Sequence, residues 1–105
     1  GLWANLGLVL ARRGRSDEAV AALRKASALD PSTAEFPGRG ALIALRAGRA
    51  SEAEAEARRA LAIAPNHVPA LSALAGALVA QRRYREAVAP LRQLDQLRSG
   101  KDRET

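Results

Sequence analysis

Side chains that could carry out catalysis are scarce in this sequence. Nucleophilic catalysis needs a nucleophile held beside a base, yet the chain has no cysteine and a single histidine, His67. His67 lies between Pro65 and Pro69, in a segment typical of a turn, and we interpret it as a solvated turn histidine. A metal site would need several further ligands at suitable spacing. We therefore expect no catalytic residue, no metal and no cofactor.

The acidic residues that lie closest together do not form an acid–base pair either. Glu52, Glu54 and Glu56 alternate at every second residue. In a helix this spacing spreads side chains around the axis and does not bring them to one point. We therefore interpret the three glutamates as a solvated face. No glycine-rich phosphate loop follows a strand, because the sequence predicts no strands.

The composition favours a small helical domain. Of the 105 residues, 48% are hydrophobic and only 3% are aromatic, and alanine dominates the apolar fraction. Alanine has the highest helix propensity and loses no side-chain entropy in a helix. The formal net charge is +6, which indicates attraction to acidic partners, although an alanine- and arginine-rich composition is also common in GC-rich genomes. No apolar run is long enough to cross a bilayer.

A period of 34 residues runs through the chain. Gly14 and Gly48 are one period apart, and several apolar positions recur in all three segments. The recurring positions are Ala19, Ala53 and Ala87; Leu23, Ala57 and Leu91; Ala26, Ala60 and Leu94; and Pro31 with Pro65. Self-similarity at this period indicates a stack of short structural repeats, each of which buries its apolar face only against its neighbours.

The period and its residues resemble the tetratricopeptide repeat, whose pattern is W-x2-L-G-x2-Y, then A-x3-F, then P. The first segment carries Trp3, Leu6, Gly7, Leu10, Ala19, Leu23 and Pro31. The third carries Leu71, Leu74, Ala75, Leu78, Ala87 and Leu91, and the second is weakest, with Pro37, Gly40, Ala41 and Ala44. The resemblance implies an all-α fold, a right-handed superhelical α-solenoid of three antiparallel helix–turn–helix hairpins. It covers residues 1–98, with repeats at about 1–33, 34–67 and 68–98, and we expect 99–105 to form a polar, disordered tail.

Helix boundaries follow from local signals. We expect helices over residues 2–13, 17–29, 35–46, 52–63, 69–81 and 85–98. Gly14 and Gly48 suit the left-handed residue that ends a helix. Ser32 with Glu35, and Ser51 with Glu54, fit capping boxes, and Asn66 fits an N-cap. Pro37 is acceptable only in a first turn, so the third helix is expected to start late or to be loose, and Pro90 should kink the last helix or fray its start.

Small residues recur where the two helices of each hairpin should cross. Bulky side chains there would hold the backbones apart. The small residues at these crossings are Gly7, Ala41 and Ala75 on the first helices, and Ala19, Ala53 and Ala87 on the second.

The family resemblance also implies a binding surface. In tetratricopeptide arrays the first helix of each hairpin lines a concave groove, where partner peptides lie. Carried over by position, the groove consists of Asn5, Leu8, Arg12, Arg39, Leu42, Leu45, Arg46, Ser72, Gly76 and Val79. The family's clamp for a terminal carboxylate is absent, since most of its positions hold Ala4, Leu8, Pro69 and Ala73. The groove instead suits an amphipathic helix or an extended apolar segment that carries acids.

A second surface repeats with the same period. Arg15, Arg49 and Arg83 fall at equivalent turns between the two helices of each hairpin, and we call them the basic ridge. One hypothesis is that the ridge steers acidic partners. The alternative is a charged, solvated edge that keeps the array in solution.

These patterns favour a non-catalytic protein-interaction module, a scaffold or adaptor that binds a protein or peptide ligand. An alternative is a regulatory or oligomerisation arm of a larger protein. Nucleic-acid binding is disfavoured because aromatic stacking groups are scarce. Leu94 and Leu97 lie on the outer side of the last predicted helix, so self-association through that helix is a further expectation. No small-molecule substrate and no membrane span are expected.

Overall fold

The computed structural model describes the backbone of residues 1–103 and the side chains of residues 1–99, and this part of the chain is all α-helix and turn. The helices are α1 (Leu2–Arg12), α2 (Ser16–Leu29), α3 (Glu35–Arg46), α4 (Ala50–Ile63), α5 (Val68–Ala80) and α6 (Tyr84–Arg103). The first five agree with the predicted ranges to within two residues at each end. Among residues 1–103, no helix combines the length and the apolar character that crossing a membrane requires.

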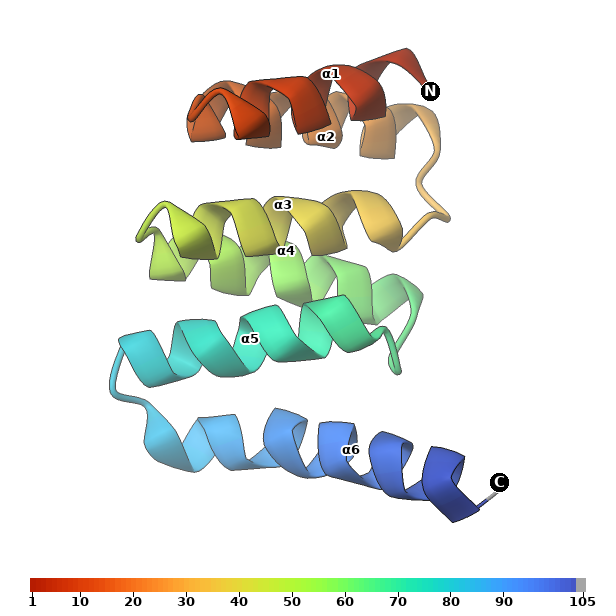
Figure 1. Ribbon diagram of the computed structural model, residues 1–105, viewed down its shortest axis with the longest axis vertical. Helices are drawn as coiled ribbons and strands as arrows, with labels where there is room; N and C mark the ends of the chain where they lie inside the picture. Colours follow the sequence, from red (N-terminus) through yellow and green to blue (C-terminus); the bar gives the residue numbers. More distant parts are fainter. Residues whose placement is uncertain (104–105) are drawn as a thin grey trace.

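The helices pair into hairpins, and the hairpins stack along the longest axis of the molecule (Figure 1). α1 packs on α2, α3 on α4 and α5 on α6, while α2 also contacts α3 and α4 contacts α5. Each hairpin therefore buries its apolar face against the next one. This arrangement confirms the predicted all-α solenoid of helical hairpins.

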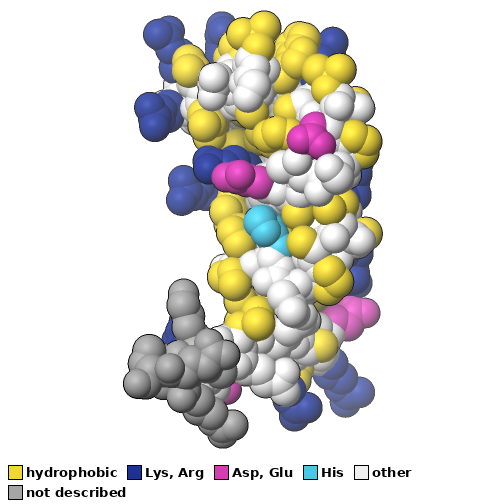
Figure 2. Space-filling view, turned by 90° about the vertical axis from the view of Figure 1, so that its right-hand side faces the viewer, with side chains coloured by type: hydrophobic (Ala, Val, Ile, Leu, Met, Phe, Trp, Pro, Cys, Tyr) yellow, Lys and Arg dark blue, Asp and Glu magenta, His cyan; other side chains and the backbone are white. Residues whose placement is uncertain are grey.

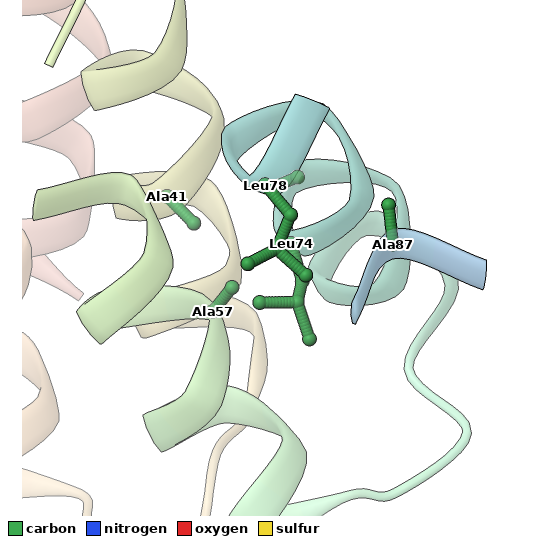
Figure 3. Close-up of a cluster of buried hydrophobic side chains, with 6 residues drawn as sticks. Ala41, Ala57, Leu74, Leu78 and Ala87 are labelled. Carbon is green, nitrogen blue, oxygen red and sulfur yellow. The ribbon is translucent and has the colours of Figure 1, made fainter. Parts of the chain in front are cut away.

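Alanine forms much of the core. The small residues predicted at the helix crossings are all buried: Gly7, Ala19, Ala41, Ala53, Ala75 and Ala87. In Figure 3, Leu74 and Leu78 of α5 lie among alanines that come from three other helices, Ala41, Ala57 and Ala87. Alanine has no side chain beyond Cβ, so the helix axes can approach closely and the leucines can fill the space between them.

The turns within the three hairpins share one hydrogen-bond pattern. The backbone N–H groups of the residues after the turn donate across it, Arg15 to Leu10, Arg49 to Ala44 and Arg83 to Leu78, at 2.8–2.9 Å. This bond requires a left-handed residue just before the donor. Gly14 and Gly48 supply it with φ of 78° and 80°, but the third turn has Arg82 at φ 61°. Arg82 therefore carries strain that its glycine counterparts do not.

The two predicted capping boxes are wrong. α3 follows Ala34 and α4 follows Arg49, and neither helix has a side-chain cap. Ser32 therefore does not cap α3 with Glu35, and Ser51, already inside α4, does not cap it with Glu54. The N-cap of α5 is His67, not Asn66. Packing between helices overrides these local signals, as short helices gain most of their stability from tertiary contacts.

Pro37 disturbs its helix less than expected, and Pro90 does not fray the start of the last helix. Pro37 is the third residue of α3, where its missing N–H would have no helical partner, so α3 begins at Glu35 without a late start. Pro90 is buried within α6, which begins six residues earlier at Tyr84. α6 also continues to Arg103, through most of the segment that was expected to be a tail, and the rest of that segment, residues 104–105, lies outside the described residues.

The glutamates of α4 do not form the solvated face that their spacing predicts. Glu56 is only 2% exposed, and its Oε1 accepts a 2.7 Å hydrogen bond from Arg24 Nε of α2. Arg24 Nη2 also lies 3.5 Å from Glu52 Oε1. A carboxylate can be buried this deeply when an opposite charge donates to it. The interpretation was wrong because it considered α4 alone, whereas the partner belongs to the preceding repeat.

Replacement of Arg82 by glycine should stabilise the fold. A non-glycine residue in the left-handed region costs about 1–2 kcal/mol, and part of this gain is lost because glycine has more freedom in the unfolded chain. We expect Arg82→Gly to raise the free energy of unfolding by about 1 kcal/mol in urea denaturation followed by circular dichroism. Gly48→Arg, the reverse change at the equivalent turn, should lower it. An unchanged or lower stability for Arg82→Gly would contradict the assignment of strain.

Candidate binding groove

A hollow of about 290 Å³ opens between α1 and α3. Its lining consists of Leu8, Ala11 and Arg12 from α1, and Arg39, Leu42, Ile43 and Arg46 from α3. Five of the predicted groove residues therefore come together here: Leu8, Arg12, Arg39, Leu42 and Arg46. Ala11 and Ile43 also line the hollow, although the predicted groove did not include them. The one signal for Ala11 is its place one period before Leu45, a predicted groove residue.

The hollow forms where two equivalent helices stay apart. α3 and α5 are in direct contact, but α1 and α3 are not among the extensively packed pairs. Between α3 and α5, Leu45 fits against Gly76, where an added Cβ would lie 2.7 Å from Leu45 Cδ2. One period earlier, Ala11 of α1 is equivalent to Leu45, and Leu42 of α3 is equivalent to Gly76. Because Leu42 stands where α5 has Gly76, α1 cannot approach α3 as closely as α3 approaches α5. A space therefore remains between α1 and α3.

The electrostatics of the hollow are unbalanced. Arg39 is neutralised within its own helix, since its Nη2 donates to Glu35 Oε1 at 2.7 Å. Arg12 and Arg46 form no ion pair with any carboxylate of the described residues. Figure 2 faces the side where α1 and α3 begin, and Lys and Arg side chains project at its upper left over the first two hairpins. Arg12 and Arg46 end these helices on the side turned away from the viewer. The hollow therefore combines an aliphatic lining with two exposed, unpaired guanidinium groups.

The remaining predicted groove residues do not join this hollow. Asn5 and Ser72 are exposed, and Val79 is 44% exposed. Leu45 is half-buried and packs against the core cluster of Val20, Ala44, Ala53 and Ala77. Leu45 and Gly76 thus contact each other. Leu45 therefore contributes to the packing of α3 on α5 as well as to any groove.

The arginines of the basic ridge all pair with carboxylates. Arg15 Nη1 lies 3.8 Å from Glu18 Oε2. Arg49 forms an ion pair with Asp17 of the preceding repeat, and Arg83 Nη1 lies 2.6 Å from Glu54 Oε1. The last two arginines therefore connect one hairpin to the previous one.

Glu54 is the acid on which the link between the second and third repeats depends. Its pKa is lowered, mainly by the hydrogen bond from Gln81 Nε2 and further by hydrogen bonds from Arg58 and Arg83, all of which favour the carboxylate over the acid. Desolvation opposes the shift without reversing it.

His67 is not the solvated turn residue that its flanking prolines indicate. Its ring packs against α3 so closely that a Cβ on Gly38 would lie 2.6 Å from Nε2. Nε2 is buried and has no hydrogen-bond partner in the described part of the chain. The residues with defined side chains also contain no group of three or more metal-ligating residues. His67 is therefore a packing residue between the second and third repeats.

Two family models match the sequence, and both describe the tetratricopeptide repeat, one over residues 44–99 and the other over residues 1–33. The chain belongs to the tetratricopeptide repeat family. The matches leave out residues 34–43, where Pro37, Gly38 and Gly40 depart from the repeat pattern.

Solved structures of other proteins have the same fold. The first such domain of Spaghetti (RPAP3), bound to the HSP90 peptide SRMEEVD, superimposes with a TM-score of 0.84 at 23% identity, over 91% of this chain and 78% of that one. The second domain, bound to the same peptide, gives 0.84 at 19% identity over 90% and 88%. A crystal structure of MamA gives 0.87 at 20% identity over 96% of this chain and 59% of that one. A comparison with curated proteins finds no match.

The lowered pKa of Glu54 predicts a pH dependence of stability. Because the folded state holds the proton less tightly than the unfolded state, Glu54 stabilises the fold above the ordinary glutamate pKa of about 4.3. This contribution is lost as the pH falls through the lower folded pKa. We expect Glu54→Gln to be less stable than wild type near neutral pH and the difference to shrink in acid, measured by urea denaturation across pH. Glu86→Gln, which changes an exposed partner of Arg83, is the control; an equal pH dependence for both variants would contradict the prediction.

Proposed function

We propose that this tetratricopeptide array is a non-catalytic scaffold or adaptor module that holds a peptide or helix of a partner protein in the groove beside α1, α3 and α5. Its fold is that of a protein–protein interaction module. The related domains of Spaghetti (RPAP3) were solved with a bound HSP90 peptide, which supports a peptide as the ligand class. Because this chain lacks the family's carboxylate clamp, its groove must bind a peptide in a way that does not use that clamp.

The hollow between α1 and α3 is the observation that carries this proposal. Its lining includes half of the residues that were assigned to the groove by position, and most of the lining residues are aliphatic. A concave, mostly apolar site with a few polar groups is the usual form of a ligand pocket.

The test uses a random peptide library displayed against the immobilised protein, followed by anisotropy titration of a labelled, enriched peptide. Leu8 lines the hollow and belongs to none of the buried clusters. We expect Leu8→Glu to weaken binding by about tenfold or more, since it removes apolar contact and places a carboxylate in the hollow.

Leu29→Glu provides the matched control, because Leu29 is 75% exposed and lies outside the hollow. It should bind like the wild type. Equal affinity of all three proteins would show that the groove is not the working surface, and thermal denaturation would confirm that each variant is folded.

An oligomerisation arm remains the second candidate, since both ends of the stack expose apolar side chains. On α1, Leu2 is 80% and Val9 is 48% exposed, while Leu91 on α6 is 50% exposed. Ala57, which is equivalent to Leu91, is 0% exposed and lies in a cluster with Ala73 and Leu74 of the next hairpin. Nucleic-acid binding through the basic ridge is less favoured, since carboxylates pair with its arginines.

Light scattering over a range of protein concentrations tests this second candidate. If the ends associate, the mass should rise with concentration for the wild type and stay monomeric for Leu91→Glu, a change at an exposed position that should not disturb folding. A monomer at all concentrations would exclude self-association of this chain.

A further inference from the structure

We propose that the hollow between α1 and α3 selects an acidic amphipathic segment, with an apolar side chain in the hollow and carboxylates on Arg12 and Arg46. The inference rests on the proposed function and names the chemistry of its ligand. Its two charged residues, Arg12 and Arg46, are distinct from the carboxylate-clamp positions that hold Ala4, Leu8, Pro69 and Ala73 in this chain. Of these four, Leu8 lines the hollow.

The apolar half of the site has a clear structural origin. Leu8 and Ala11 of α1 face Leu42 and Ile43 of α3 across a space of about 290 Å³. All four side chains are half-buried, so each keeps part of its apolar surface in contact with water. Covering this surface with an aliphatic or aromatic side chain of a partner removes it from water and contributes binding free energy.

The charged half consists of two equivalent residues. Arg12 and Arg46 are one period apart and are the last residues of α1 and α3, so both lie at the same end of the hollow. Carboxylates of the chain neutralise the ridge arginines and Arg39, whereas none of the described carboxylates pairs with these two. A guanidinium beside an apolar surface binds a carboxylate with two parallel hydrogen bonds.

The third repeat has no arginine at this position. The equivalent residue is Ala80, at the end of α5. The charge preference is therefore confined to the first two hairpins, and the part of a partner that lies against α5 needs no acid. This asymmetry gives the groove a direction, since a bound segment must place its acidic part against α1 and α3.

Arginine in a last turn also has a structural role, because a cation stabilises the C-terminal end of a helix. Glutamine keeps much of the length and hydrogen-bonding capacity of the side chain while it removes the charge. The test variant is Arg12→Gln with Arg46→Gln. The matched control is Arg13→Gln with Arg92→Gln, which removes the same charge from two exposed arginines outside the hollow. Thermal denaturation of both proteins reports the structural contribution separately.

The probes are two degenerate peptide libraries of equal length with an apolar residue at the centre. One has Asp or Glu at the flanking positions, and the other has Asn or Gln. We expect the wild type to retain the acidic library about tenfold more strongly than the amide library at low salt, with the preference shrinking as salt is added. The Arg12 and Arg46 variant should lose the preference, and the control variant should keep it.

Equal retention of both libraries by the wild type would overturn the inference and leave the proposed function standing. A preference for acids that survives in the Arg12 and Arg46 variant would also overturn it, since the charge would then act from elsewhere. Retention of no peptide from either library or from the random library would reject the proposed function together with the inference.

Discussion

The close approach of neighbouring helices is the constraint on which the rest of this structure depends. Alanine and glycine at the crossings allow it, and Ala19, Ala53 and Ala57 are completely buried. Each alanine buries little apolar surface, so no single contact contributes much free energy. The stack is stable only because the same small contacts repeat along it. Any position where a larger residue replaces a small one therefore changes the distance between helices, not merely the local packing.

The groove follows directly from this constraint. Gly76 accepts Leu45 and brings α5 against α3, while Leu42 at the equivalent position of α3 keeps α1 away. The same pair of positions thus makes a tight contact in one part of the array and an open hollow in the other. The second repeat is the weakest match to the family pattern. It contributes four of the seven residues that line the hollow.

Charges divide into two groups by their place in the stack. Arginines near a neighbouring hairpin find carboxylates there: Arg24 binds Glu56, Arg49 binds Asp17 and Arg83 binds Glu54. These pairs link side chains of successive repeats. Arg12 and Arg46 face the hollow, where no carboxylate of the described residues reaches them. Arg12 and Arg46 therefore present two positive charges at a place where a partner can meet them.

The sequence by itself determined the fold class, the repeat period and the positions of the first five helices. These features follow from local patterns, alanine-rich helical segments joined by turns that contain glycine. It also indicated five of the seven residues around the hollow through the family resemblance. Helix caps depended on tertiary structure. So did the roles of Glu56 and His67, since the groups that decide them lie in other helices, Arg24 in α2 and Gly38 in α3. The hollow and the pairing of the ridge arginines were likewise decided only by the stack. The physical reason is that each of these features depends on the distance between side chains of different helices, which the stacking of the hairpins sets and which no single segment encodes.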